Sequence, residues 1–493
     1  MKEIYLKNKN LDELVLEPGT KYVFEDGEYS LSKTIFVDVP CEFEGHNAWI
    51  KGNHDHYGFL VRSSDVTIKD LKFANVIAAV EVDGWGKEIE NILIENLYVD
   101  LLLTGIQVGS SRSNSTIRNV AIKNCFINLE GVSLWEQDEL AGRLPLEIGA
   151  CCGRQDSPEL VTNCLLENLL VEGNTTKGAN RGAFNLILAA ETEMKMLQFN
   201  VKYGVNKIKN VIVKGNNFDL CWDSPINVTC ALANNELSTI ENIEICENTA
   251  RFGIAGIYFF CGEPLIGTSL NHTIKGVKIH HNHLIRGVED VGEPTRGIFM
   301  GAARVDYYPG TIINDCLIED VEIYGNTIEG AGIVVAGCYN LPDLDATCNR
   351  NCINNISIHD NFIKNADTAF TFDGLSIEGR LYDWNFGYPR HDKKWGEEIT
   401  DDTVETYHCE DNQIKNLICE NNTIEGYRYR VKATGADLRG HGVAKNNKVS
   451  ENIIFKNNKF GVGENHIHVA DVVKEDFAHD AGGNKVSQEF FKK

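Results

Sequence analysis

The sequence predicts an all-β protein, a right-handed parallel β-helix of about eleven or more three-strand coils with long loops on one side. Three observations predict it. A short apolar alternation recurs along the chain, an asparagine recurs at one position of the repeat, and a second alternating segment follows most copies. The 493 residues exceed the usual size of one globular core, and one elongated domain of stacked repeats accounts for that length.

The repeated segment alternates apolar and polar residues, as at Val211 and Val213 in IKNVIVKGNNF. A period of two indicates a strand and excludes a helix. The copies begin at Ser64, Ile89, Ile117, Glu167, Ile208, Ile240, Ile274, Ile318, Ile353, Ile414 and Ser450.

An asparagine stands six residues after the first Asn-like position of the repeat in eight successive copies. Asn tolerates left-handed backbone angles, and its amide can bond to an amide stacked above it. We therefore expect these side chains to form a column at one turn of the coil. They are Asn174, Asn216, Asn248, Asn282, Asn326, Asn361, Asn422 and Asn458.

A second alternating strand follows this turn, and a shorter one is expected before the next copy. The second strands are Ile106 to Val108, Ile226 to Val228, Ile257 to Phe259, Ile298 to Met300, Ile333 to Val335, Phe370 to Phe372 and Ile467 to Val469. Repeat spacing runs from 26 to 61 residues, whereas a bare coil needs only about 22. The surplus predicts loops that leave one side of the solenoid and wall a groove.

This pattern resembles the pectin-lyase-like superfamily of right-handed β-helix proteins. The resemblance covers about residues 60 to 470 and includes the opening stretch EPGTKYVFEDGEYSLSKTI. It implies a carbohydrate-active protein, since the superfamily includes glycoside hydrolases, polysaccharide lyases, fructotransferases, uronan epimerases and phage tailspikes. We expect an N-terminal cap with the first strands over residues 1–60, the β-helix over 61–470 and a C-terminal cap or tail over 471–493.

Charge and composition limit the classes of molecule that the protein is expected to bind. The net charge of -24 disfavours nucleic acid and anionic membrane surfaces, and it favours a neutral oligosaccharide over a polyanionic one. No stretch approaches the length of apolar residues that a membrane span needs. The N-terminus lacks a signal-peptide pattern, and the 15 cysteines have no regular spacing, so we expect reduced thiols and a cytoplasmic protein. A homo-oligomer, trimer or dimer, is compatible with this architecture.

Carboxylates near the roots of the predicted loops are the candidate catalytic groups, because glycoside hydrolysis needs an acid paired with a base or nucleophile. Glu263 ranks first, with Asp223 expected one coil earlier and Asp306 one coil later. Neighbouring coils would place such groups roughly 5 Å apart. Glu191, two coils before Glu263, is the alternative partner at the wider separation of inverting enzymes.

Substrate binding is expected from aromatic and polar residues on the same side. Tyr258 and Phe260 must point outward, because Ile257 and Phe259 point inward, and exposed aromatic rings suit stacking on sugars. The loops themselves could cover these rings instead. The predicted binding residues are Glu191, Trp222, Asn227, Tyr258, Phe260, Phe299, Arg304, Asp373 and Trp384.

Residues of the types that ligate metals occur in groups, such as His280, His281 and His283, or Cys338, Cys348 and Cys352. Neither group forms a recognisable complete ligand set. We therefore expect no metal and no cofactor. The leading functional hypothesis is a glycoside hydrolase, or a related glycan-rearranging enzyme, acting on neutral oligosaccharides. Two alternatives stay open: a uronan lyase or epimerase, in which Arg304 neutralises the sugar carboxylate, and a non-enzymatic tailspike-like or scaffold solenoid.

Overall fold

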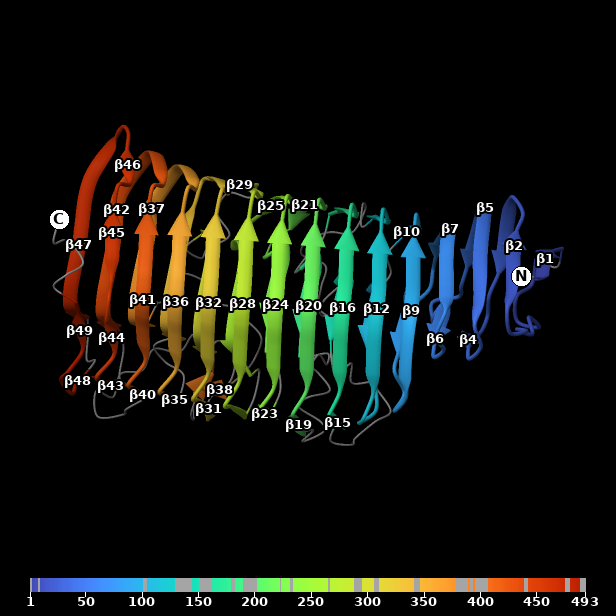
Figure 1. Ribbon diagram of the computed structural model, residues 1–493, viewed down its shortest axis with the longest axis horizontal. Helices are drawn as coiled ribbons and strands as arrows, with labels where there is room; N and C mark the ends of the chain where they lie inside the picture. Colours follow the sequence, from blue (N-terminus) through green and yellow to red (C-terminus); the bar gives the residue numbers. More distant parts are fainter. Residues whose placement is uncertain are drawn as a thin grey trace.

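The predicted solenoid is present in the computed structural model. The structure describes residues 2–7, 9–100, 104–128, 144–149, 161–178, 182–188, 202–221, 223–230, 234–264, 267–287, 295–305, 310–340, 346–377, 389–390, 393–394, 407–438, 442–474 and 479–487. Within these residues there is no helix, and 38 strands join one sheet whose pairings are parallel. Successive coils stack along one axis, with the two chain termini at opposite ends (Figure 1). The fold is a right-handed parallel β-helix.

The repeats found in the sequence form the first ladder of parallel strands, which faces the viewer in Figure 1. Its strands pair in register, so that Leu169, Val211, Ile243 and Val277 stack in the core. The ladder contains β1 (Lys2–Leu6), β2 (Thr20–Phe24), β5 (Cys41–Lys51), β7 (Val66–Ala74), β9 (Glu88–Glu95), β12 (Thr116–Lys123), β16 (Leu165–Glu172), β20 (Lys207–Lys214), β24 (Thr239–Cys246), β28 (Thr273–His280), β32 (Leu317–Tyr324), β36 (Cys352–His359), β41 (Gln413–Glu420), β44 (Lys448–Ser450), β45 (Ile454–Lys456) and β49 (Lys485–Val486).

A second ladder of short strands follows the first-ladder strands. The sequence analysis did not distinguish these short strands from the alternating strands that come after them. It contains β3 (Gly27–Ser30), β10 (Tyr98–Asp100), β13 (Phe126–Asn128), β17 (Thr175–Lys177), β21 (Asn217–Cys221), β25 (Thr249–Phe252), β29 (His283–Arg286), β33 (Thr327–Glu329) and β46 (Lys459–Phe460). In the later coils it merges with the third ladder, because β37 and β42 run through both.

The third ladder contains the predicted second alternating strands. Its members are β4 (Ile35–Val37), β6 (Phe59–Val61), β8 (Ala78–Asp83), β11 (Thr104–Gly109), β14 (Leu144–Gly149), β18 (Phe184–Ile187), β22 (Ile226–Thr229), β26 (Ala255–Gly262), β30 (Arg296–Val305), β34 (Gly332–Asn340), β37 (Phe362–Ile377), β42 (Thr423–Leu438) and β47 (Gly463–Lys474). All seven segments predicted from the alternation lie in these strands, which confirms that part of the interpretation.

From β15 (Val161–Thr162) onward, a fourth ladder of short strands closes the coils and matches the expected shorter strand before the next repeat. It contains β15, β19 (Lys202–Gly204), β23 (Asn234–Glu236), β27 (Thr268–Leu270), β31 (Thr311–Asn314), β35 (Ala346–Asn349), β40 (Tyr407–Glu410), β43 (Gly442–Lys445) and β48 (His479–Asp480). A separate antiparallel pair joins β38 (Pro389–Arg390) to β39 (Lys393–Lys394).

The eight predicted asparagines form one continuous amide column inside the coil. Asn248 Nδ2 donates to Asn282 Oδ1 at 2.9 Å, and Asn282 Nδ2 donates to Asn326 Oδ1 at 2.9 Å. The same bond joins every neighbouring pair from Asn174 to Asn458. We expected these asparagines to have left-handed backbone angles and stacked amides. The amides do stack, but none of the eight asparagines has a positive φ. The residue directly before each one has the positive φ, as at Glu247 and His281.

The first Asn-like residue of the repeat forms an exposed ladder of its own. Asn168, Asn210 and Asn242 have φ near +60° in the middle of β16, β20 and β24. Their amides are joined by bonds of 3.0 Å from Asn242 to Asn210 and from Asn210 to Asn168. Because a left-handed residue turns a strand, each first-ladder strand changes direction at this level.

Candidate functional site

The outer face of the third ladder gathers side chains from successive coils into columns. Val80 and Val82 of β8 point into the core, so Glu81 points outward, and the same alternation holds along the ladder. Register pairing then places one outward residue per coil in a single column. From the N-terminal end the column contains Phe36, Leu60, Glu81, Gln107, Glu147, Asn185, Asn227, Tyr258, Phe299, Val334, Thr371, Lys432 and His468.

Two carboxylates, Glu81 and Glu147, stand two coils apart in this column with Gln107 between them. Both are buried, with 2% and 4% of their surface exposed. Gln107 Nε2 donates to Glu147 Oε1 at 3.2 Å. Burial raises the pKa of Glu147 to about 7, the amide of Gln107 opposes the rise, and the charge of Glu81 adds to it. Glu147 is therefore suited to hold a proton near neutral pH.

The outward positions beside Gln107 and Glu147 are glycines. Gly109 and Gly149 occupy the outward positions two residues beyond Gln107 and Glu147, and they pair with each other. Further along the column, Asn227 Nδ2 donates to Asn185 Oδ1 at 2.8 Å. From Glu81 to Asn227 the column thus joins acid and amide groups in a row of hydrogen-bonding side chains.

Glu263, our first-ranked catalytic residue, lies just past the end of β26 and is buried. Tyr258 donates its hydroxyl hydrogen to Glu263 Oε1, and Arg304 Nε lies 3.9 Å from that oxygen. The Arg304 guanidinium is also stacked among four aromatic rings, with centroid distances from 4.9 to 5.7 Å. This carboxylate is therefore held between a phenol and a cation.

The aromatic residues point out of the coil as predicted, but they are not exposed. Tyr258, Phe260 and Phe299 are 0–5% exposed and pack with Tyr339, Ala336 and Ala255 into a second apolar cluster. Arg296 covers this cluster, with its guanidinium 4.1 Å from the Phe299 ring centroid. The expectation that these rings present free faces to a sugar is wrong, because neighbouring rings and two arginines already cover them.

The structure does not bring Asp223 to Glu263. Ile254 N donates to the Asp223 carbonyl at 3.1 Å, so Asp223 is level with Ile254, before the start of β26. Glu263 follows Ile254 by nine residues, which is about 30 Å along an extended strand. The two residues do come from adjacent coils, but our expected distance of roughly 5 Å is wrong for this pair. Stacking brings residues together only when they lie at the same level of the coil.

The remaining predicted residues divide into two groups. Asp373 is buried in β37, three coils beyond Phe260 in a parallel outward column, and it accepts a hydrogen bond from Thr434 Oγ1. Asp306, Glu191, Trp222 and Trp384 lie outside the described residues.

Sequence reasoning missed Glu81, Gln107, Glu147 and Asn185. The signal was present, because each stands between apolar residues of a short alternation, as in Val80-Glu81-Val82 and Leu146-Glu147-Ile148. Aligning these short strands with the later, longer ones would have placed all four in the column of Asn227 and Tyr258.

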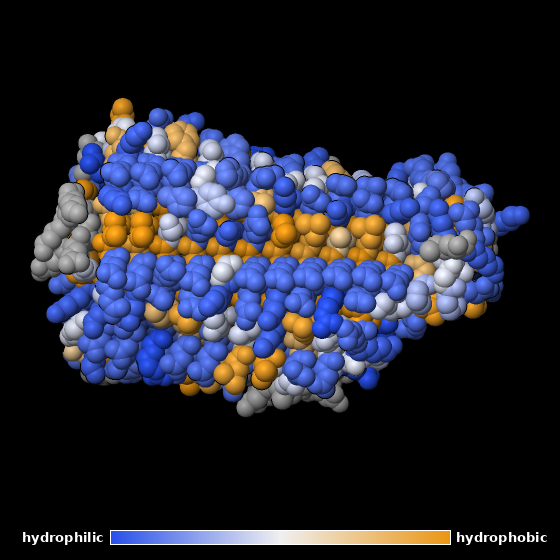
Figure 2. All heavy atoms as spheres, in the orientation of Figure 1, coloured by the Kyte–Doolittle hydropathy of each residue, from blue (hydrophilic) through white to orange (hydrophobic). Residues whose placement is uncertain are grey.

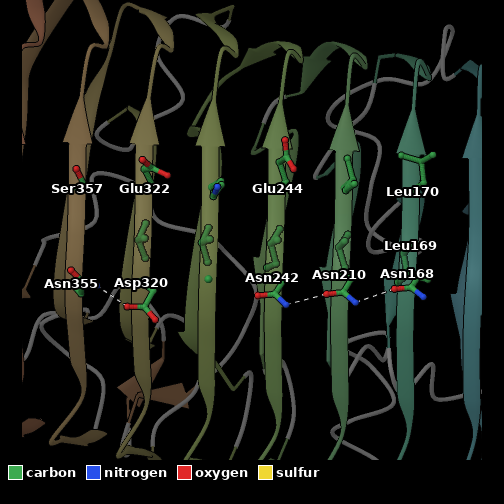
Figure 3. Close-up of a pocket in the computed structure, with 17 residues that line it drawn as sticks. Asn168, Leu169, Leu170, Asn210, Asn242, Glu244, Asp320, Glu322, Asn355 and Ser357 are labelled. Carbon is green, nitrogen blue, oxygen red and sulfur yellow. Dashed lines mark hydrogen bonds between the residues drawn. The ribbon is translucent and has the colours of Figure 1, made fainter.

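A groove of about 800 Å³ lies on a different face, along the outside of the first ladder. Its apolar lining includes Leu169, Leu170, Val211 and Ile212, and an apolar stripe runs along this face between polar bands (Figure 2). The exposed asparagine ladder borders it on one side, and Glu244 and Glu322 stand on the other (Figure 3). The groove lies on the first ladder, whereas Glu81, Gln107 and Glu147 lie on the third. We call the column of these three residues the acidic column, and the groove is on another face of the coil.

Comparisons with known proteins give distant similarities. Residues 392–490 match a family described as a protein of unknown function, DUF1565. No curated protein matches the sequence. Among solved structures, a GH136 lacto-N-biosidase from Eubacterium ramulus is similar at 12% identity and a TM-score of 0.34. The match covers 84% of this chain and 63% of the biosidase, so the chain spans less than two thirds of that protein.

Two other solved structures show the range of similar proteins. The PL6 family alginate lyase AlyGC is 11% identical with a TM-score of 0.26, over 98% of this chain and all of the lyase. PfbA, a surface adhesin of Streptococcus pneumoniae, is 11% identical with a TM-score of 0.30, over 84% of this chain and 85% of the adhesin. Among the described residues, no helix is long and apolar enough to cross a membrane.

Proposed function

We propose that the protein is a glycoside hydrolase whose acid and base are Glu147 and Glu81. The observation that carries the proposal is the raised pKa of Glu147, about 7, beside a second buried carboxylate on the same outward column. A carboxyl group that keeps its proton near neutral pH can protonate a glycosidic oxygen, and a second carboxylate can activate water.

The spacing supports an inverting reaction. Glu81 and Glu147 are two rungs apart, which is about 10 Å between backbones. Inverting glycosidases hold their carboxyl groups about 6.5–9.5 Å apart, leaving room for a water molecule. Gln107 lies between the two, where its amide contacts Glu147 and keeps that carboxyl oriented. A neutral oligosaccharide remains the expected substrate, because the chain has a net charge of -24.

An activity screen tests this proposal. Neutral and uronic oligosaccharides are incubated with the full chain, and products are identified by mass spectrometry, which distinguishes addition of water from elimination. On any substrate that is cleaved, we expect Glu147→Gln to lower kcat/KM by about 10²–10⁴-fold, because the general acid is lost. Glu172→Gln is the matched control, since Glu172 is a half-exposed outward residue of the first ladder. A Glu147→Gln variant that is as active as this control would disprove the assignment.

A uronan lyase or epimerase is the second candidate, and one observation favours it. Arg304, Glu263 and Tyr258 place a cation, a carboxylate and a phenol together on the same face. Such reactions need a cation to neutralise the sugar carboxylate and a base to remove the neighbouring proton. Unsaturated products from uronic substrates, with activity unaffected by Glu147→Gln, would favour this candidate.

A further inference from the structure

Three metal-ligating side chains meet on the outer face of the first ladder, away from the acidic column. Cys246 and His280 end β24 and β28 and pair in register. Glu244 precedes Cys246 by two residues, so both point to the same side of the sheet. The ligand atoms of Glu244, Cys246 and His280 all lie within 4.8 Å of one another, and His280 Nε2 is 3.1 Å from Glu244 Oε1.

The imidazole of His280 is held in a fixed orientation. It stacks on the ring of Tyr324, with centroids 4.7 Å apart and planes 12° apart, and Tyr324 stacks on His359. Its Nδ1 lies 2.9 Å from Nδ1 of His281. The other ring nitrogen, Nε2, therefore faces Glu244 and Cys246. Metal-binding histidines are commonly oriented in this way, by contacts made through the rest of the ring.

The charges around Cys246 favour a cation. The carboxylates of Glu244 and Glu247 stand two residues before and one residue after Cys246, and Lys214 of the neighbouring coil pairs with Cys246 in register. A divalent metal among these groups would offset the negative charge and displace the thiol proton to solvent, forming a metal–sulfur bond. Cys246 is 2% exposed, so its sulfur is shielded from bulk water.

We propose that Glu244, Cys246 and His280 bind a zinc ion. Sulfur, imidazole nitrogen and carboxylate oxygen are the ligands zinc takes in proteins, and four-coordinate zinc with three protein ligands keeps one open position. Glu244 also lines the first-ladder groove, so the ion adjoins a space of about 800 Å³. The fourth ligand is then water or an oxygen of a molecule lying in that groove.

The proposed site differs from the expectation of a protein without metal. The histidine group was visible in the sequence, but its partners belong to the previous repeat, 34 residues earlier. Only the stacking of coils joins the two repeats.

A second group of thiols provides an internal comparison. Cys338, Cys348 and Cys409 also have their sulfur atoms within 4.8 Å of one another, but they belong to the main apolar core of the coil. Metal bound there would be coordinated by sulfur alone, whereas the proposed site uses one thiolate.

Cobalt substitution tests the proposal directly, without an enzyme assay. The full chain is stripped of metal under reducing conditions and titrated with Co²⁺. We expect saturation at one equivalent, with a sulfur-to-cobalt charge-transfer band and the visible bands of four-coordinate cobalt, both lost when Zn²⁺ is added. Cys246→Ser should abolish the charge-transfer band, and Glu244→Gln should weaken cobalt binding about 10-fold or more.

Two control variants test whether cobalt binds at Glu244, Cys246 and His280 or at the core thiols. His283→Ala removes a nearby histidine that is not part of the ligand group and whose Nε2 lies 3.0 Å from Glu329, and Cys409→Ser removes a thiol of the core group. Both should bind cobalt as the unmodified chain does. The proposal is overturned if the unmodified chain gives no charge-transfer band, or if the band survives Cys246→Ser and disappears in Cys409→Ser. The Cys246→Ser variant could fail to fold. The Glu244→Gln variant then still tests the proposal, since the Glu244 side chain is 42% exposed and its replacement should leave the fold intact.

Discussion

Glu147 and Glu263 are buried carboxylates on the same outer face, yet their surroundings suit different chemistry. Glu147 has an amide, Gln107, as its hydrogen-bonding neighbour and a second carboxylate nearby, so burial dominates and the proton is retained. Glu263 instead accepts a hydrogen bond from Tyr258 and lies near the Arg304 guanidinium. Glu263 is thus the carboxylate beside a buried arginine.

The pH dependence of stability tests the environment of Glu147. Its pKa is about 7 in the folded chain and 4.5 for an unperturbed glutamate. Because the folded-state pKa is raised, the ionised carboxylate lowers the free energy of unfolding as pH rises above 4.5, and the loss is complete once pH passes about 7. Glu147→Gln should therefore match the unmodified chain near pH 4 and exceed it by at most about 3 kcal/mol at pH 8.

Melting temperatures recorded at a series of pH values check this expectation. A difference between the two proteins that is constant with pH would contradict it, since glutamine does not titrate.

Replacement of Glu263 should affect stability rather than leave it unchanged. Glu263→Gln leaves the Arg304 guanidinium buried without its nearby anion, and we expect a loss on the order of 1–3 kcal/mol. Glu319→Gln is the matched control, because Glu319 forms a half-exposed pair with Lys275, and such pairs contribute less than about 1 kcal/mol. Thermal unfolding followed by circular dichroism provides the measurement. Equal melting temperatures for the two variants would show that the buried Arg304 guanidinium does not depend on the Glu263 carboxylate.

At the scale of the element, the turn after each first-ladder strand depends on the inner asparagine column. The side chain of Asn282 makes four hydrogen bonds. Its Oδ1 accepts from the backbone N and Nδ2 of Asn248, and its Nδ2 donates to Asn326 Oδ1 and to the Ile245 carbonyl. The exposed ladder is different, because its amides face solvent and glycine already replaces asparagine at Gly276, with φ +70°.

Substitution in the two ladders should therefore give unequal results. Asn282→Ala leaves buried donors and acceptors on both neighbouring coils unpaired, and we expect a loss on the order of 2–4 kcal/mol. Asn242→Gly keeps the left-handed backbone and removes an exposed amide with its solvent-exposed hydrogen bond to Asn210, so its effect should stay within about 0.5 kcal/mol. Denaturant melts of the two variants compare them. If both lose the same stability, the inner column has no special role.

The strands and the inner column could be predicted because each depends on short-range pattern. Alternation identifies a strand, and the fixed offset of Asn174 or Asn282 within the repeat identifies a turn. The site could not be predicted in the same way. Asp223 and Glu263 come from adjacent coils, but their level within the coil depends on how many residues the intervening strands and turns take up. The repeat pattern does not fix that number, because repeat length varies from 26 to 61 residues.

At the scale of the whole molecule, each coil contacts chiefly its two neighbours. Strand pairing joins β24 to β20 and β28, and β28 to β24 and β32, and the same holds along the ladder. The stability of such a solenoid is close to a sum of coil and interface contributions. The acidic column lies mainly in the N-terminal half of the third ladder, whereas Cys246 and His280 lie near the middle of the first. The two proposed sites therefore belong to different coils and can respond separately to local damage.

Hydrogen exchange of the Asn282→Ala variant should reveal this locality. The substitution weakens the interfaces on both sides of its own coil, so amides of β24, β28 and β32 should exchange faster. Amides of β7, β9 and β12 should exchange as in the unmodified chain, because the intervening coils keep their own interfaces. Peptide-resolved mass spectrometry after timed labelling measures both regions. Uniformly faster exchange along all the strands would mean that the solenoid opens as one cooperative unit, and the two sites could then not be perturbed independently.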